Sequence, residues 1–212
     1  MGRFADLDAV TLDANGTLVR LIDPVPKLDR TLTELGIERA TGEIRRAVEA
    51  EGAVYARRSM EAHEPAAFAT LQHECAGIFL RELAADGIDA VEFAPLYVAA
   101  MDFEVVPGVP ESLRQLRRRG LELAVIANFD LTLLERLEKL GLGSAFSAIV
   151  TPADAGAAKP DPHIFELTLE RLGVSASRAL HIGDGSRDEE GARAAGMHFE
   201  WAPVPSALDS WR

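Results

Sequence analysis

Residues 9–17 read AVTLDANGT, a short apolar run followed by a polar turn. The apolar part, residues 9–12, is rich in residues that favour strands, and Asp13 stops it. The turn residues Asn15, Gly16 and Thr17 follow directly. Because a short apolar run bounded by turn residues is typical of a buried strand, we expect one at residues 9–12.

The second half of the chain repeats this arrangement. Strand signals occur at residues 121–127, 148–150, 179–182 and 198–201, with helical signals between them. We expect one helix from Asp130, as its N-cap, to a stop at Gly141, a second over residues 162–172, and a short alanine-rich one ending at Gly196. Strands that alternate with helices of this length predict an α/β fold, a doubly wound parallel sheet with helices on both faces.

Residues 21–103 have a different pattern. Their apolar residues recur at helical spacing, and no strand signal is present. Cys75 lies in this pattern between Leu71 and Ile78, so we expect it to pack in a core. The block predicts an inserted all-helical subdomain over residues 21–103, with residues 1–20 and 104–212 forming the α/β core.

The composition excludes several classes of partner. The 212 residues are 48% hydrophobic and carry a net charge of −12, and an acidic surface repels nucleic acids and anionic membranes. The single cysteine cannot form an internal disulfide, no apolar run reaches the ~18 residues of a membrane span, and the first residues lack a signal-peptide pattern. We therefore expect a cytoplasmic protein without nucleic-acid or membrane partners, and the sequence leaves the oligomeric state open.

Three of the expected strands end in small polar residues, namely Asp13, Asn128 and Asp184. Ligands of open parallel sheets bind at the carboxyl ends of the strands, although each residue alone is also typical of a turn or a helix N-cap. Asp184 and Asp188 form a close acidic pair that would suit Mg²⁺, or else a solvated helix start. Lys159 offers a compact charge suited to phosphate, or is an ordinary surface lysine. Together these residues favour a ligand site.

The order of these segments resembles the haloacid dehalogenase (HAD) superfamily. Residues 13–18, DANGTL, resemble its first motif, residues 126–128, IAN, its second, Lys159-Pro160 its third, and residues 183–188, GDGSRD, its fourth. The resemblance spans residues 9–197 and implies a Rossmann-like core with a helical cap inserted between the first two motifs. Residues 128–130, 159–162 and 191–197 further resemble the branch of haloacid dehalogenase-like hydrolase domain-containing protein 3.

The resemblance implies roles for individual residues. Asp13 would be the nucleophile and would form an aspartyl phosphate, while Lys159 would balance charge between Asp13 and the phosphoryl oxygens. Mg²⁺ would be held by Asp13, the backbone carbonyl of Asn15 and Asp184, with support from Asp188. The residues expected to bind phosphate are Asn15, Gly16, Thr17 and Asn128. The implied activity is that of a Mg²⁺-dependent phosphatase acting on a small phosphorylated metabolite.

Two positions depart from the family pattern. Asn15 stands in place of the aspartate that acts as general acid and base, whose function is typically worth ~10²–10⁴-fold in rate. Ala127 stands in place of a hydroxyl residue, and one such donor is worth ~10²–10³-fold in comparable sites. The alternatives are a 2-haloacid dehalogenase-type hydrolase, which in this family lacks the metal, and a binding module without turnover. The retained Asp184 and Asp188 pair favours the phosphatase.

Overall fold

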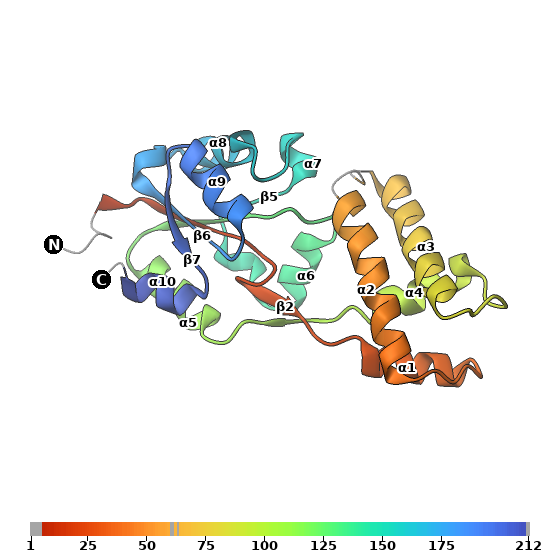
Figure 1. The fold of residues 1–212 in the computed structure, drawn as a ribbon. Coiled ribbons are helices and arrows are strands. Elements are labelled where there is room, and N and C mark those ends of the chain that lie inside the picture. Colours follow the sequence, from red (N-terminus) through yellow and green to blue (C-terminus); the bar gives the residue numbers. More distant parts are fainter. Residues whose placement is uncertain (1–5, 60–61, 63, 211–212) are drawn as a thin grey trace. The chain divides into compact units, whose positions relative to one another are not determined.

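The computed structural model describes residues 6–59, 62 and 64–210, and the chain divides into two compact units (Figure 1). Residues Met1–Arg20 and Glu104–Arg212 belong to the first unit, and Leu21–Phe103 form the second. Each unit has a hydrophobic core of its own.

The first unit is built on a five-stranded sheet with the order β5-β4-β1-β6-β7. The strands are β1 (Ala9–Leu12), β4 (Glu122–Ile126), β5 (Ala148–Val150), β6 (Ala179–Gly183) and β7 (His198–Trp201). Every neighbouring pair is parallel, and all residues of the central β1 and of β6 are buried. The expected doubly wound α/β fold is thereby confirmed, with β4 one residue shorter at each end than the sequence pattern predicts.

Helices cover both faces of this sheet (Figure 1). They are α5 (Val109–Arg118), α6 (Leu133–Lys139), α7 (Pro152–Ala155), α8 (Pro162–Leu172), α9 (Ser186–Ala194) and α10 (Val204–Ser210), with short 3₁₀ turns η3 (Gly143–Ala145) and η4 (Ala176–Arg178). Helices α8 and α9 pack together on one face, and α5 and α10 on the other.

Two helix boundaries show how local sequence sets them. Helix α8 begins after Asp161, whose carboxylate accepts a hydrogen bond from the backbone N–H of His163 at 2.9 Å, and ends at Gly173 with a φ of 67°. The expected N-cap at Asp130 is wrong by two residues. The Asp130 carboxylate accepts hydrogen bonds from the backbone and hydroxyl of Thr132, at 2.7 and 2.6 Å, and so closes a turn that precedes α6.

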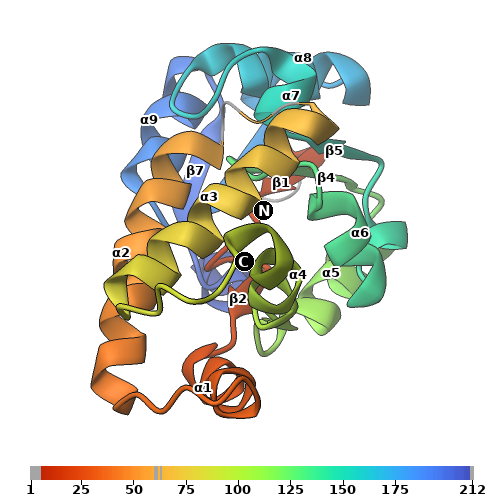
Figure 2. The same ribbon diagram turned by 90° about the vertical axis from the view of Figure 1, so that its right-hand side faces the viewer.

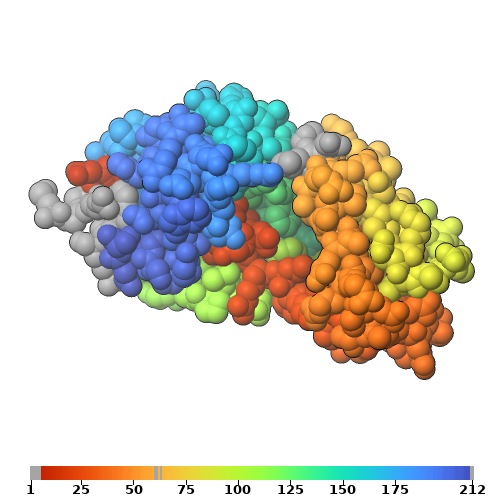
Figure 3. Space-filling model, in the orientation of Figure 1, coloured from red at the N-terminus to blue at the C-terminus, as the bar shows by residue number. Residues whose placement is uncertain are grey.

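The second unit consists of the helices α1 (Val25–Glu34), α2 (Thr41–Arg58), α3 (Pro65–Glu82) and α4 (Ala90–Ala99), coloured orange to yellow-green in Figures 2 and 3. Its core contains the aromatic rings of Phe79, Phe93 and Tyr97, whose centroids lie 4.9–6.3 Å apart. The Tyr97 hydroxyl donates to the buried carboxylate of Glu51 at 2.8 Å. Cys75 is buried, as its apolar neighbours predict.

The sequence pattern misses several elements of the described chain, among them two short strands and the last helix. Strands β2 (Val19–Leu21) and β3 (Phe103–Val105) pair as a two-stranded sheet where the chain passes between the units, and three residues are too few to show alternation. Helix α10 was not expected in the tail, but it buries Val204, Ala207 and Leu208. Over the residues described, none of the helices combines the length and apolar character that crossing a bilayer requires.

Candidate active site

Three neighbouring strands, β4, β1 and β6, bring their carboxyl ends to one edge of the sheet. Asp13 follows β1 directly, and its backbone N–H donates to the carbonyl of Ile182 in β6 at 2.9 Å. Asp184 follows β6, and Asn128 lies two residues beyond β4. The parallel register therefore brings together the three strand-end residues that the sequence singles out.

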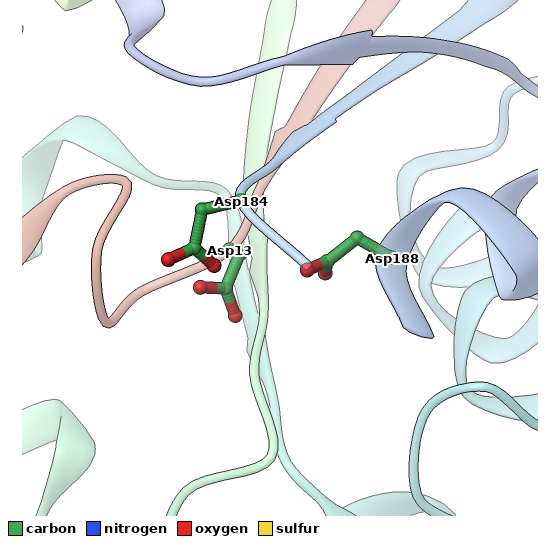
Figure 4. Close-up of side chains that lie close together, drawn as sticks. All are labelled: Asp13, Asp184 and Asp188. Carbon is green, nitrogen blue, oxygen red and sulfur yellow. The ribbon is translucent and has the colours of Figure 1, made fainter. Parts of the chain in front are cut away.

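Three carboxylates gather at this edge, those of Asp13, Asp184 and Asp188 (Figure 4). One oxygen atom from each lies within 4.8 Å of the other two. Asp188 comes from the first turn of α9, which starts just after β6. Asp13 and Asp188 are buried, whereas Asp184 is exposed to solvent.

Two glycines allow the carboxylates to approach the backbone. A Cβ atom on Gly183 would lie 2.3 Å from the Cγ atom of Asp188. A Cβ atom on Gly16 would lie 1.9 Å from an oxygen of Asp184, and Gly16 also has a φ of +88°, which favours glycine. Any side chain at either position would displace a carboxylate of the cluster.

Lys159 supplies the positive charge of the cluster. Its Nζ atom donates to Oδ1 of Asp13 at 2.5 Å, to Oδ1 of Asp188 at 2.5 Å and to the carbonyl of Ile126 at 2.9 Å. These contacts use all three N–H groups of an ammonium, and the side chain is only 4% exposed. The alternative of an ordinary surface lysine is therefore wrong.

The environment shifts the pKa values of the three carboxyl groups in different directions. Burial raises the pKa of Asp13 to about 6, although the charge of Lys159 opposes the shift. Burial also favours the neutral form of Asp188, but the hydrogen bond from His181 and the charge of Lys159 outweigh it and lower that pKa to about 2. Partial burial, together with the charge of Asp188, raises the pKa of Asp184.

His181 and Thr11 belong to the site, and the sequence analysis did not assign them to it. They face each other across β1 and β6, because Thr11 is paired with His181 in the parallel register. Nε2 of His181 lies 3.0 Å from Oδ1 of Asp188, and Nδ1 lies 2.8 Å from the Thr11 hydroxyl. Since Asp188 is ionised, Nε2 must carry the proton, and the Thr11 hydroxyl then donates to Nδ1.

A sequence signal for this pair exists in retrospect. Thr11 precedes Asp13 by two residues, so both side chains point to the same face of β1. His181 is a polar residue within the apolar strand β6, and a fully buried polar group needs a hydrogen-bond partner. The edge of Phe165 packs against its ring, with centroids 5.0 Å apart.

Asn128 has a partner that the sequence does not predict. Its Nδ2 atom donates to the carbonyl of Lys159 at 2.9 Å, and its Oδ1 atom accepts from the backbone N–H of Lys159 at 2.8 Å. The Asn128 amide thus forms two hydrogen bonds with the backbone of Lys159. Its expected role in binding phosphate stays a prediction.

The remaining residues of the first two motifs lie in the same region. Asn15 and Gly16 are exposed in the turn after β1, and Gly16 lies against Asp184. Thr17 is fully buried, and within the described part of the chain its hydroxyl has no hydrogen-bond partner. A buried unpaired hydroxyl costs about 1–3 kcal/mol, so Thr17 remains a candidate donor to a ligand. Ala127 is buried and offers only its backbone.

The donor set fits a hard divalent cation. Carboxylate oxygens are the ligands that Mg²⁺ prefers, and three of them converge here. Against the three carboxylates stands one buried ammonium, so the ionised cluster carries two unbalanced negative charges. A divalent cation neutralises both, and the exposed Asp184 lies on the solvent side from which it would enter.

This arrangement defines a class of α/β hydrolases in which an aspartate, a lysine and an acidic pair meet at the carboxyl ends of parallel strands. The family model for haloacid dehalogenase-like hydrolase matches residues 7–196. The match covers most of the chain. The chain therefore belongs to the haloacid dehalogenase-like hydrolases, and the family resemblance found in the sequence is confirmed.

Individual relatives agree with this assignment. Haloacid dehalogenase-like hydrolase domain-containing protein 3 of Bos taurus is 44% identical over 108 residues, which cover 50% of this chain and 43% of the relative's length. A phosphoglycolate phosphatase of Pseudomonas savastanoi pv. phaseolicola is 36% identical over 195 residues, 89% of this chain and 66% of that protein. The crystal structure of a HAD phosphatase from Thermococcus onnurineus superposes with a TM-score of 0.58 at 25% identity, covering 92% of this chain and 86% of that one.

Proposed function

We propose that the chain is a Mg²⁺-dependent phosphatase of a small phosphorylated metabolite, with Asp13 as its nucleophile. The observation that carries the proposal is the convergence of three carboxylates within 4.8 Å beside the Lys159 ammonium. Phosphoryl transfer depends on positioning and on neutralising charge, and this cluster suits both. The name of the 36% identical relative, phosphoglycolate phosphatase, supports hydrolysis of a phosphate ester as the type of reaction.

The reaction has two steps. In the first, a carboxylate oxygen of Asp13 attacks phosphorus, the bond from phosphorus to the leaving-group oxygen breaks, and an aspartyl phosphate forms. In the second, water attacks the phosphorus, inorganic phosphate leaves and the Asp13 carboxylate is restored. Lys159 holds Asp13 and balances the charge on the phosphoryl oxygens. Mg²⁺, held by Asp13, Asp184 and the Asn15 carbonyl with Asp188 in support, would neutralise the charge of the phosphoryl group.

Asn15 and Ala127 make this phosphatase slow and selective for good leaving groups. The Asn15 amide can neither protonate a leaving group nor take a proton from water, a function worth ~10²–10⁴-fold. Ala127 has no hydroxyl to donate to the phosphoryl group. The leaving group must therefore depart unprotonated, which aryl and acyl phosphates do and sugar phosphates do not. The aspartyl phosphate on Asp13 should then persist.

Pre-steady-state kinetics with p-nitrophenyl phosphate test the proposal. We expect a burst of nitrophenol release followed by slow turnover. Asp13→Asn should remove both phases, whereas the matched control Asp89→Asn, at the N-cap of α4, should change neither. Asn15→Asp should raise the steady rate by up to ~10²-fold, because it restores a general acid and base.

Other outcomes would point elsewhere. If Asp13→Asn abolishes activity while Asn15→Asp changes nothing, a different group serves as acid and base. If no phosphate ester is cleaved in Mg²⁺, the phosphatase proposal fails. Release of halide from a 2-haloacid would then support dehalogenation, which the same nucleophile performs without a cation, and its absence would support a binding role.

A further inference from the structure

We propose that Asn128 is a positioning residue for Lys159: its amide holds the lysine backbone where the ammonium reaches Asp13 and Asp188. The consequence for catalysis rests on the proposed phosphatase function, whereas the placement of Lys159 does not.

The first support is the pairing of Asn128 with the Lys159 backbone. Lys159 lies in the loop between α7 and α8, where no strand pairing holds the chain. Its N–H and its carbonyl both bond to the Asn128 side chain, at 2.8 and 2.9 Å. The amide therefore does for this loop what a neighbouring strand does in a sheet, because it satisfies one donor and one acceptor of the same residue.

The second support is that the ammonium of Lys159 also binds to the end of β4. The Nζ atom donates to the carbonyl of Ile126, two residues before Asn128. The end of β4 thus holds Lys159 at its backbone and at its ammonium. A free lysine side chain samples many rotamers, and a buried ammonium needs good geometry to offset its desolvation. Fixing both ends restricts the side chain to conformations in which the ammonium reaches the carboxylates.

The competing reading makes Asn128 a direct phosphate ligand, as its motif position suggests. In that reading, replacing Asn128 weakens substrate binding and leaves Lys159 where it is. In ours, the replacement frees the Lys159 loop even when no substrate or metal is present. Lysine accessibility therefore separates the two readings without reference to activity.

The chain suits such a measurement because its only lysines are Lys27, Lys139 and Lys159. In metal-free protein treated with an amine-acylating reagent, Lys159 should label far more slowly than Lys139, since their side chains are 4% and 72% exposed. Mass spectrometry of peptides after cleavage at acidic residues gives the rate at each site. Lys27 and Lys139 serve as internal references.

We expect Asn128→Ala to raise the labelling rate of Lys159 at least about tenfold, because two hydrogen bonds that keep the loop closed are lost. Asn128→Asp keeps the shape and the acceptor for the lysine N–H but has no N–H for its carbonyl, so its rate should lie between those of wild type and Asn128→Ala. The matched control is Thr168→Val, which removes a buried hydrogen bond in α8 and should leave Lys159 protected.

The proposal would be overturned if Lys159 labels no faster in either Asn128 variant than it does in Thr168→Val. An unchanged labelling rate with a raised KM for p-nitrophenyl phosphate would assign Asn128 to substrate binding instead. If Asn128→Ala unfolds, Lys159 labels about as fast as the exposed Lys139, and Asn128→Asp decides the question. If the wild type cleaves no phosphate ester, the proposed function fails, but the labelling rates still decide the role of Asn128. If the wild type is active, we expect Asn128→Ala to lower kcat with little change in KM.

Discussion

Replacing Lys159 by methionine removes the ammonium but keeps a side chain of similar length. Asp13 and Asp188 are then left buried, each without the partner that now lies 2.5 Å away. His181 and the Gly185 N–H still donate to Asp188, but no positive charge remains in contact with either carboxylate among the described contacts. The variant therefore tests whether the lysine holds the metal-free site together.

The expected loss of stability is large. Removing one partner of a buried ion pair costs about 3–5 kcal/mol, because the remaining charge is buried without compensation. Each kcal/mol lowers the Tm of a chain of this size by roughly 2–4 °C, so Lys159→Met should melt roughly 6–20 °C below wild type. The loss should be smaller at pH 5 than at pH 7. Burial raises the pKa of Asp13 to about 6 against the opposing charge of Lys159, and loss of that charge raises the pKa further, so lowering the pH protonates this carboxyl group and removes the uncompensated charge.

Thermal melts in EDTA, followed by circular dichroism, give the comparison. Lys139→Met is the matched control, because Lys139 pairs with Glu135 on the exposed surface of α6. Its Tm should equal that of the wild type. Adding Mg²⁺ should restore part of the lost Tm, since a cation takes over the neutralising role. Equal melting of Lys159→Met and Lys139→Met in EDTA at pH 7 would refute the reasoning.

Three further predictions concern other features. Mg²⁺ affinity, measured by calorimetry, should fall as the pH drops from 7 to 5, because protons compete for Asp13, whose pKa is about 6; an affinity independent of pH would contradict this. Gly183→Ala should weaken Mg²⁺ binding about 10–100-fold, because the added Cβ displaces Asp188. The control Gly52→Ala, whose Cβ meets open space within α2, should stabilise the protein by about 0.5–1 kcal/mol. A normal Mg²⁺ affinity in Gly183→Ala would argue against the close contact. Burial raises the pKa of the Cys75 thiol, so a thiol reagent should modify it only after denaturant unfolds the protein, and prompt reaction of the native protein would count against its burial.

The sequence was sufficient for the sheet and for the residues that end its strands. Asp13 and Asp184 follow apolar runs whose length and composition are typical of buried strands, and parallel strands end at one edge. Asp188 and Lys159 were placed in the site by the resemblance of their motifs to the HAD superfamily, because from the residues alone a helix start and a surface lysine stayed open. The sheet and its strand ends are predictable because they depend on local sequence and on a general rule of sheet topology.

The parts of the site that depend on register could not be predicted. His181 looks like a core residue of β6, and only its pairing with Thr11 shows that the ring lies beside Asp188. The partner of Asn128 depends on the course of a loop 31 residues further along the chain. Asp130 was expected as a helix N-cap because aspartate is typical of that position, but its carboxylate closes a turn two residues before the observed N-cap, Thr132.

The central position of β1 has a consequence for how the protein folds as it is synthesised. β1 is the first strand of the sheet to be made, yet its two neighbours are β4 and β6, and its contacts with Lys159 and His181 join residues 146 and 170 positions apart. A chain still emerging from the ribosome therefore holds an apolar strand with both edges unpaired until most of the sequence has followed. Pairing over such separations is slow, so β1, which leads directly into Asp13, is open to aggregation for most of the time that the chain is being made.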